Sequence, residues 1–278
     1  MSAGPQAALL PDGRRLHLHH GPIDLIIDVD VDADLRAAAH ARAIRRFSGL
    51  LGDLVRDLPA LRRPLDATPL VDPVARRMAR AVAPFAPLFV TPMAAVAGAV
   101  ADEMLVALVA DAPIAKAWVN NGGDIAFHLA AGQEMTALGP SGAIRVPAAS
   151  PSRGLATSGW RGRSLSLGIA DAVTVCAATA AEADVAATLI ANVVDLPGHP
   201  AIRRVPACDL VPDSDLGDRP VTTGVGPLSL AETRRALQGG LAFARDLVAR
   251  GLIHDAVLCL NGERLSTAQT EESVPLHA

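Results

Sequence analysis

Two adjacent glycines place the tightest constraint on how this chain can fold. They occur in WVNNGGDIAFHL, residues 118–129, between two short apolar runs. Asn-Gly and Gly-Gly pairs in such a setting are the strongest local signal of a β-hairpin, so we expect antiparallel strands here. Glycine also lets a ligand approach the backbone closely. A plain turn and a ligand-binding turn are both consistent with this stretch.

The composition predicts a globular chain with an ample core and excludes several classes of protein. Of the 278 residues, 50% are hydrophobic and only 3% aromatic, with no tyrosine, so the core must consist of aliphatic side chains. The net charge of −4 lacks the basic excess that nucleic-acid binding requires. The chain also has no uninterrupted run of the roughly 18 apolar residues that a membrane span requires.

The expected compartment is the cytoplasm. The N-terminal stretch lacks the basic and apolar pattern of an export signal. Cys176, Cys208 and Cys259 lie far apart and form no Cys-x-x-Cys pair, which is typical of thiols in a reducing compartment. We therefore predict a cytoplasmic protein with a small-molecule ligand, no nucleic-acid or membrane partner and, as a possible assembly, a homodimer.

Apolar periodicity predicts two strands and two helices in the first third of the chain. Residues 14–30 alternate between apolar and polar types, which indicates two paired strands. Asp32 then caps a long helix with an apolar stripe, and we expect Pro59 to end it. A second helix is predicted from Pro73.

A slim helix follows, and then a part of the chain that is rich in strands. Thr91 at the N-cap and Pro92 at the first helical position predict a helix built mostly of Ala, Val and Gly. Such a helix either packs tightly on both sides or leaves space for a bound molecule. The remaining predictions are strands over 132–178, a helix over 180–194, a Pro/Asp-rich loop over 196–220, a helix over 229–250 and a strand over 256–260.

These elements together predict an α+β fold in which helices cover a mainly antiparallel sheet. No linker or repeat divides the chain, so we expect residues 1–264 to form a single domain. The segment 265–278 is polar and is predicted to be a disordered tail.

The segment GLATSGWRGRSLSLG, residues 154–168, combines groups that suit a nucleotide. Thr157, Ser158 and Gly159 offer hydroxyls and free amides, and Trp160 offers a flat aromatic face. With the neighbouring arginines, this set fits a phosphate or pyrophosphate together with a ring. An ordinary loop with a half-buried tryptophan is the alternative.

Two oxygen-bearing side chains share a face of the helix predicted over 180–194. Asp184 and Thr188 are four residues apart and therefore lie one turn apart. A carboxylate and a hydroxyl in this arrangement suit Mg²⁺, although both positions also fit a solvated helix face. Asp213, Asp215 and Asp218 offer a second candidate cation site, with Asx-turns as the alternative.

Taken in order, these motifs resemble a known succession. VAGAVADEML, WVNNGGDIAF, LATSG and AEADVAATL follow the pattern of ApbE, the FAD:protein FMN transferase family. The chain is closer still to a family of uncharacterised ApbE-like proteins (UPF class) from bacteria and archaea, over roughly residues 10–262. That resemblance rests on GPIDL, PVARRM, FVTPMAAVAGAVADE, NNGGDI, GLATSGWRGRSLSLGIADAVTV, ATLIAN and DSDLGDR.

The resemblance implies an ApbE-like fold with FAD or a related nucleotide in a cleft and Mg²⁺ beside it. Asp184 and Thr188 would hold the metal. The residues expected to bind the cofactor are Asp102, Asn121, Gly122, Gly123, Asp124, Thr157, Ser158, Gly159 and Trp160.

The chain departs from the ApbE pattern at groups that catalysis needs. The lysine of the family's Lys-Gly pair aligns with Ala97, and the stretch His-x-x-Asp-Pro-x-Thr-Gly has no counterpart, although Asp171 offers a substitute for its aspartate. No lipobox cysteine lies near the N-terminus. Phosphoryl-transfer enzymes work by positioning and by neutralising charge, so these losses weigh against genuine FMN transferase activity.

Two further functions are consistent with the sequence, besides that of a flavin- or nucleotide-dependent transferase. Archaeal members of the resembling family imply an accessory role in sulfide assimilation leading to homocysteine. A persulfide carrier would need a reactive cysteine, and none of the three has an activating neighbour in sequence. The other alternative is a non-catalytic scaffold that has kept the ApbE fold.

Overall fold

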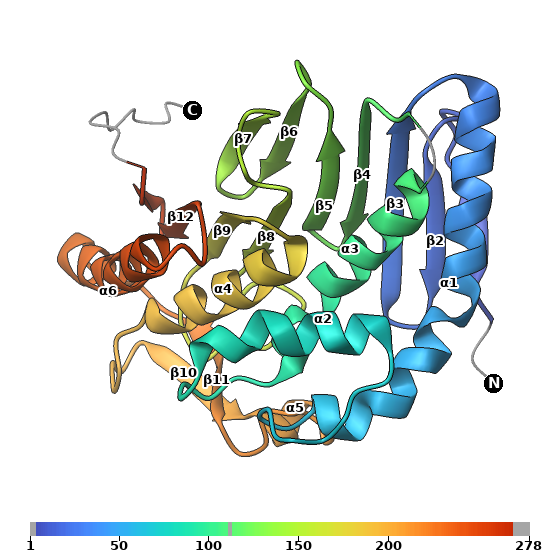
Figure 1. The fold of residues 1–278 in the computed structure, drawn as a ribbon. Coiled ribbons are helices and arrows are strands. Elements are labelled where there is room, and N and C mark those ends of the chain that lie inside the picture. The colour runs from blue at the N-terminus through green and yellow to red at the C-terminus, as the bar shows by residue number, and fades with distance from the viewer. Residues whose placement is uncertain (1–3, 111–112, 269–278) are drawn as a thin grey trace.

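A nine-stranded antiparallel sheet forms the centre of the computed structural model, which describes residues 4–110 and 113–268 (Figure 1). Every pair of neighbouring strands in this sheet is antiparallel. In spatial order the strands are β1 (Gln6–Leu9), β2 (Leu16–His20), β3 (Ile23–Asp30), β4 (Lys116–Asn121), β5 (Asp124–Leu129), β8 (Gly154–Ser158), β9 (Ala172–Ala177), β12 (Asp255–Leu260) and β13 (Glu263–Ser266). The predicted α+β class with a mainly antiparallel sheet is therefore confirmed.

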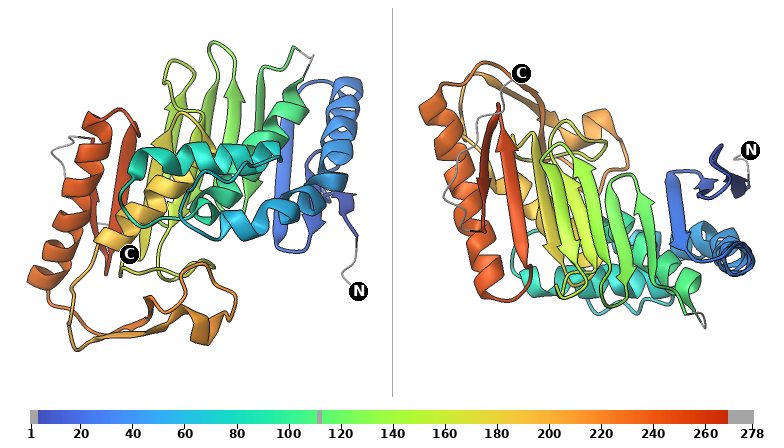
Figure 2. Two further views of the ribbon diagram at one scale, coloured as in Figure 1. Left: turned by 60° about the horizontal axis from the view of Figure 1, so that its bottom comes forward. Right: turned by 90° about the horizontal axis from the view of Figure 1, so that it is seen from above.

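The main helices pack against the sheet, with α3 and α4 over its centre (Figures 1 and 2). α3 lies on β4 and β5, and α4 lies on β8 and β9. α1 packs near β2 and β3, whereas α6 packs on β12 and β13. Their bounds are α1 (Ala33–Leu61), α2 (Pro73–Val82), α3 (Val96–Val109), α4 (Ala180–Val193) and α6 (Leu230–Ala249).

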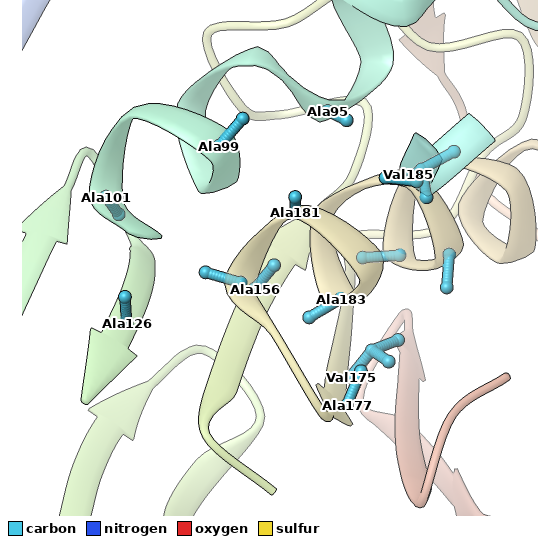
Figure 3. Packing of buried hydrophobic residues seen from close by; sticks show 14 of the residues in the cluster. Ala95, Ala99, Ala101, Ala126, Ala156, Val175, Ala177, Ala181, Ala183 and Val185 are labelled. Carbon is cyan, nitrogen blue, oxygen red and sulfur yellow. The ribbon is translucent and has the colours of Figure 1, made fainter. Parts of the chain in front are cut away.

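The slim helix predicted after Pro92 packs tightly and leaves no room for a ligand against α4. Alanines from α3, α4 and the sheet fill the contact (Figure 3). Gly98 lies directly against the backbone of Ala180, where even a Cβ would overlap the carbonyl group. Small side chains thus let two helices and the sheet approach closely, which explains a core with few aromatic residues.

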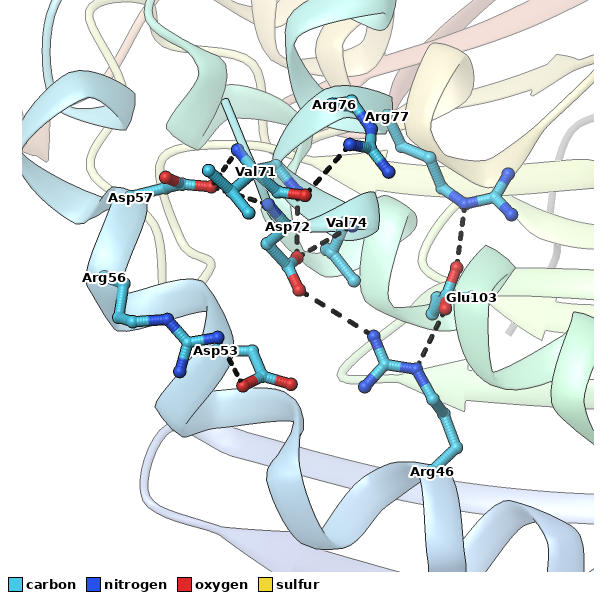
Figure 4. Close-up of polar contacts among 11 residues, drawn as sticks. Arg46, Asp53, Arg56, Asp57, Val71, Asp72, Val74, Arg76, Arg77 and Glu103 are labelled. Carbon is cyan, nitrogen blue, oxygen red and sulfur yellow. Dashed lines mark hydrogen bonds and ion pairs between the residues drawn. The ribbon is translucent and has the colours of Figure 1, made fainter. Parts of the chain in front are cut away.

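A charged network joins the three helices α1, α2 and α3 (Figure 4). Arg46 of α1 pairs with Glu103 of α3 at 2.9 Å, and Arg77 of α2 reaches the other oxygen of Glu103 at 3.3 Å. Arg46 also lies 3.9 Å from Asp72, whose carboxylate caps α2 by accepting from the amide of Val74. The network fixes the helices relative to one another on the sheet.

A hairpin covers part of the opposite face of the sheet. It consists of β6 (Glu134–Gly139) and β7 (Gly142–Pro147). Met135, Ala137 and Val146 of the hairpin belong to a separate apolar cluster, which also contains the sheet residues Ile125, Phe127, Leu129, Leu155 and Cys176. The hairpin therefore has its own small core beneath it, distinct from the core under the helices.

The segment predicted as a loop over 196–220 contains regular structure. It includes β10 (Ile202–Pro206), which pairs with β11 (Pro220–Val225), and the short helix α5 (Ala207–Leu210). The three aspartates of this segment do not share a cation site, because each has its own partner: Asp213 pairs with Arg62, Asp215 accepts from the Thr91 hydroxyl, and Asp218 accepts from the Cys208 thiol.

Several predicted boundaries are corrected. α1 continues through Pro59 to Leu61, because a proline near the helix end interrupts few intrahelical hydrogen bonds. Pro92 begins a 3-10 turn, Pro92–Ala95, before α3, and Thr91 makes no capping bond. The last strand extends to Ser266, two residues past the predicted domain end, while residues 269–278 of the predicted tail lie outside the described part.

One helical stretch among the described residues has the length and composition of a membrane span. Pro92–Val109 comprises 18 residues with a mean hydropathy of 1.7, and half of it is buried inside the fold. Its contacts with α1, α2, α4 and the sheet are those of a core helix.

Candidate functional site

A cleft of about 290 Å³ lies between the β6–β7 hairpin and the face of the sheet opposite the helices. The predicted glycine turn and the Thr157–Gly159 segment both contribute to its lining. The lining residues are Asn120, Gly122, Gly123, Ile125, Ala137, Leu138, Gly139, Pro140, Gly142, Ile144, Leu155, Thr157, Ser158, Gly159, Arg161, Gly162, Asp171, Ala172 and Thr174.

The two glycines form a two-residue turn between β4 and β5. Gly122 has φ of 66° and Gly123 has φ of 119°, a region that favours glycine over other residues. Within residues 4–110 and 113–268, no atom beyond the adjacent residues would lie within 4 Å of a Cβ on Gly123. The turn conformation therefore accounts for both glycines, and the turn also borders the cleft.

Strand alternation separates the two asparagines before this turn. Asn120 lines the cleft, and its side-chain oxygen accepts from the amide of Gly123 at 2.8 Å. Asn121 points toward the helices, where its amide group donates to the carbonyl of Ala97 at 3.1 Å. The predicted cofactor residue Asn121 is thus buried on the helix side, and Asn120 takes its place in the cleft.

The same alternation divides the Thr157–Gly159 segment. Thr157 faces the cleft, and its hydroxyl lies 2.9 Å from that of Thr174 on β9. The Ser158 hydroxyl lies on the other side of β8, 3.5 Å from the hydroxyl of Thr188 on α4. Gly159 packs against the backbone of Asp171 so closely that a side chain would not fit.

Asp124 and Asp184 lie close together on the helix side of this region. Asp124 accepts from the amide of Thr157 at 3.3 Å, and Asp184 accepts from the amide of Gly98 at 3.0 Å. Burial raises the pKa of Asp124 to about 7. Burial, together with the negative charge of Asp124, raises the pKa of Asp184 well above its usual value.

Neither Asp124 nor Asp184 forms a salt bridge within residues 4–110 and 113–268. Two neighbouring carboxylates without a cationic partner repel each other when both are ionised. A divalent cation beside Asp184 and Thr188 would relieve this repulsion, and the carboxylate and hydroxyl oxygens are donors that Mg²⁺ accepts. The oxygen donors present therefore fit Mg²⁺, although no group of three His, Cys, Asp or Glu side chains converges among the described residues.

The third predicted acid, Asp102, lies inside the helix layer. Its two carboxylate oxygens accept from the amides of Ala180 and Ala181 at 3.0 Å each. Burial raises the pKa of Asp102 to about 6, although these amides lower it. Asp102 joins α3 to the first turn of α4, where the helix dipole favours a negative charge.

Trp160 is not one of the residues that line the cleft. Its indole nitrogen donates to Asp171 at 3.2 Å, and the guanidinium of Arg161 lies 4.7 Å from the ring centroid. Arg161 also pairs with Asp171 at 2.7 Å. The three side chains thus form one contact group at the border of the cleft, where Arg161 and Asp171 are the lining members.

Asn120, Thr174 and the β6–β7 hairpin line the cleft without having been predicted from the sequence. The period-2 pattern of residues 116–121 places Asn120 on the face opposite Val119 and Asn121, so this signal was available in the sequence. Thr174 pairs with Thr157 across β8 and β9, a register that no local pattern specifies. The hairpin reaches the cleft only through tertiary packing.

The pKa of each of the three cysteine thiols is raised. Burial, reinforced by Asp255, raises the pKa of Cys176 to about 12. A hydrogen bond to Asp218 raises the pKa of Cys208, and burial raises that of Cys259. A raised pKa lowers the fraction of reactive thiolate, so this observation does not favour the persulfide-carrier alternative.

Comparison with known proteins matches nearly the whole chain to one family. A family model described as AbpE bacteria matches residues 7–266. The chain is 40% identical over 106 residues to a UPF0280 protein of Archaeoglobus fulgidus, which is 38% of this chain but only 45% of that relative. It is 35% identical over 175 residues to a UPF0280 protein of Methanopyrus kandleri, covering 59% of this chain and 69% of that relative.

Proposed function

Because this chain belongs to the AbpE bacteria family, we propose that it binds a flavin or a related nucleotide, together with Mg²⁺, at the cleft and the adjoining acidic pair. The ApbE-like resemblance predicted from the motifs is confirmed at the level of the family. The ligand, the metal and a cytoplasmic location are the proposed parts.

The observation that carries the proposal is the meeting of three predicted motifs at the end of β8. The Gly122–Gly123 turn and Thr157 border the cleft. Ser158, the next residue, contacts Thr188 beside Asp184. A ligand that extends from the cleft around the end of β8 would reach the oxygen donors of α4.

Each group has a defined task in this proposal. The amides of the turn and the hydroxyl of Thr157 would orient the ligand by hydrogen bonds. Asp184 and Thr188 would hold Mg²⁺, which would neutralise phosphate oxygens of the ligand. Ala97 stands where the ApbE pattern has a lysine, so we propose binding of the nucleotide rather than FMN transfer.

Thermal unfolding with and without ligand tests the proposal. FAD or FMN with Mg²⁺ should raise the Tm of the wild-type protein by about 3–5 °C at ligand concentrations near 100 times Kd. Asp184→Asn should remove the part of the shift that depends on Mg²⁺. Asp213→Asn, which alters an exposed aspartate outside the cleft, should behave as the wild type.

Two results would contradict the proposed function. The first is an unchanged Tm with FAD, FMN and ADP, each measured with Mg²⁺. The second is a Mg²⁺-dependent shift that is the same in wild type and Asp184→Asn, since the metal would then be bound elsewhere.

A further inference from the structure

The β6–β7 hairpin stands outside the hydrogen-bonded ladder of the main sheet. Among the described residues, β6 and β7 pair only with each other and form a two-stranded sheet of their own. Their register runs from Glu134 and Pro147 at the base to Gly139 and Gly142 at the tip. The hairpin can therefore change its position on the main sheet without breaking the strand pairing of either sheet.

Apolar packing holds the base of the hairpin on the main sheet. Met135 and Val146 are buried in the cluster that contains Phe127 of β5. The ammonium of Lys116 on β4 also donates to the backbone carbonyl of Glu134 at 2.6 Å. Burial of several apolar side chains makes the base the firmly attached end of the hairpin.

The tip of the hairpin is attached through one side chain in the part of the chain that the structure describes. Thr174 of β9 donates to the hydroxyl of Ser141 at 2.8 Å, and both residues are only 3% exposed. Thr157, which lines the cleft, lies 2.9 Å from Thr174. A hydrogen bond between two hydroxyls stabilises much less than the apolar packing of the base. The tip is therefore the end that can leave the sheet.

The thiol of Cys259 lies beneath this tip. Ser141 is within hydrogen-bonding reach of the thiol. Cys259 is paired with Arg264 across β12 and β13, and the guanidinium of Arg264 lies 3.6 Å from the position of a Cβ on Gly142. The tip shields Cys259 while it rests on the sheet, so the reactivity of this thiol reports whether the tip is lifted.

The cleft lies between the two attachments of the hairpin. The hairpin supplies one wall, and Ile125, Leu155 and Thr157 of the sheet belong to the other. A molecule in the cleft is enclosed as long as both attachments hold. We propose that the hairpin is a flap: its base is the hinge, the hydrogen bond between Thr174 and Ser141 is the latch, and release of the latch lifts the tip and admits a ligand to the cleft.

As a gate for a ligand, the flap rests on the proposed function, but its movement can be measured without any ligand. Iodoacetamide labelling of Cys259 is followed by mass spectrometry, with Cys208 on α5, outside the cleft, as the internal reference. Thr174→Val removes the latch and should raise the labelling rate of Cys259 relative to Cys208 by about tenfold. Thr136→Val, the same substitution at an exposed threonine of the hairpin, should label as the wild type.

The direction of the change distinguishes lifting of the tip from a change in thiol chemistry. Burial raises the pKa of Cys259, and the contact with Ser141 acts in the opposite direction. Loss of this contact without lifting would leave less thiolate and would slow the labelling. A ratio of labelling rates in Thr174→Val that equals the wild-type ratio, or lies below it, would overturn the flap.

A reversible lock tests the flap with an independent variant. Ser141→Cys places a second thiol beside Cys259, and mild oxidation should join the two and hold the tip down. The oxidised variant should take up FAD with Mg²⁺ about tenfold more slowly than the same variant after reduction, because entry requires lifting of the tip. Ser141→Cys combined with Cys259→Ser should show no such difference. Equal uptake by the oxidised and reduced variant would contradict the gate, as would failure of the two thiols to join.

The outcomes separate this inference from the proposed function. If Thr174→Val accelerates labelling of Cys259 but FAD, FMN and ADP leave the Tm unchanged, the movement of the flap stands and the nucleotide-binding proposal falls. If FAD with Mg²⁺ raises the Tm of the wild type but Thr174→Val labels as the wild type, the nucleotide-binding proposal stands and the flap falls.

Discussion

Two half-buried acids that form no salt bridge among the described residues are the most informative feature at the scale of single residues. Asp124 and Asp184 come from the glycine turn and from α4, and burial raises the pKa of both. Such an arrangement costs stability at neutral pH, and perturbed carboxyls of this kind cluster at functional sites. We therefore expect the two carboxyl groups to serve ligand binding at a cost to the stability of the folded protein.

The pH dependence of stability tests this cost at Asp124. The pKa of Asp124 is about 7 in the folded protein and about 4 in an unfolded chain. Between these values the unfolded state releases its proton while the folded state keeps it, so the free energy of unfolding falls as the pH rises. Asp124→Asn removes this loss and should be on the order of 1–2 kcal/mol more stable than wild type at pH 8.

Urea unfolding at pH 4.5 and pH 8 without divalent cations provides the measurement. The stability gain of Asp124→Asn should be small at pH 4.5 and larger at pH 8. Because Asp124 and Asp184 titrate as a pair, the transition should be broad. A gain that is equal at both pH values would show that ionisation of Asp124 is not responsible.

At the scale of elements, the contact between α3 and α4 decides how the helix layer sits on the sheet. Gly98 allows the backbone of α3 to approach Ala180 directly. Asp102, one turn further along α3, accepts from the first two amides of α4. Thr179 and Glu182 add a capping box at the same helix start. Close packing and hydrogen bonding therefore both hold the first turn of α4 against α3.

Alanine at two helical glycines should have opposite effects. Gly98→Ala introduces a Cβ that overlaps the Ala180 carbonyl and should destabilise the protein by roughly 1–3 kcal/mol. Gly52→Ala, in α1, adds a Cβ in open space and should stabilise by about 0.5–1 kcal/mol through helix propensity. Chemical denaturation of both variants checks the pair, and a loss of stability at both positions would refute the packing argument.

At the scale of the whole molecule, the sheet is a platform with two different faces. The helices bury one face in an alanine-rich core, and the β6–β7 hairpin covers only part of the other. The hairpin contacts the sheet at its base, through the apolar cluster that includes Phe127, and at its tip, where Thr174 donates to Ser141 at 2.8 Å, and the cleft lies between hairpin and sheet.

This arrangement predicts a gradient of local stability across the sheet. Amide hydrogen exchange should be slowest in β8 and β9, which have strands on both sides and α4 above them. It should be at least a hundredfold faster in β1, an edge strand whose four residues are all exposed. Mass-spectrometric exchange measures this directly, and protection of β1 equal to that of β9 would disagree with the structure.

The sequence by itself determined the long helices, the central hairpin and the family, but not the strands β10 and β11. The helix start after Asp32, the helix predicted from Pro73, the hairpin at Gly122–Gly123 and the α+β class all follow from local signals, because caps, turns and periodicity are decided by neighbouring residues. Helix boundaries were less well determined. α1 continues past Pro59 to Leu61, because a proline near the helix end interrupts few intrahelical hydrogen bonds.

Only the tertiary structure decided which side chains meet. Asn120 rather than Asn121 borders the cleft, and Thr157 and Ser158 point to opposite faces of β8. Asp184 and Thr188 therefore lie across β8 from the cleft and reach it only around the strand end. The β6–β7 hairpin completes the cleft. Its local sequence pattern does not predict which strands it packs on, because strand register and long-range contacts depend on which faces of the whole sheet are buried.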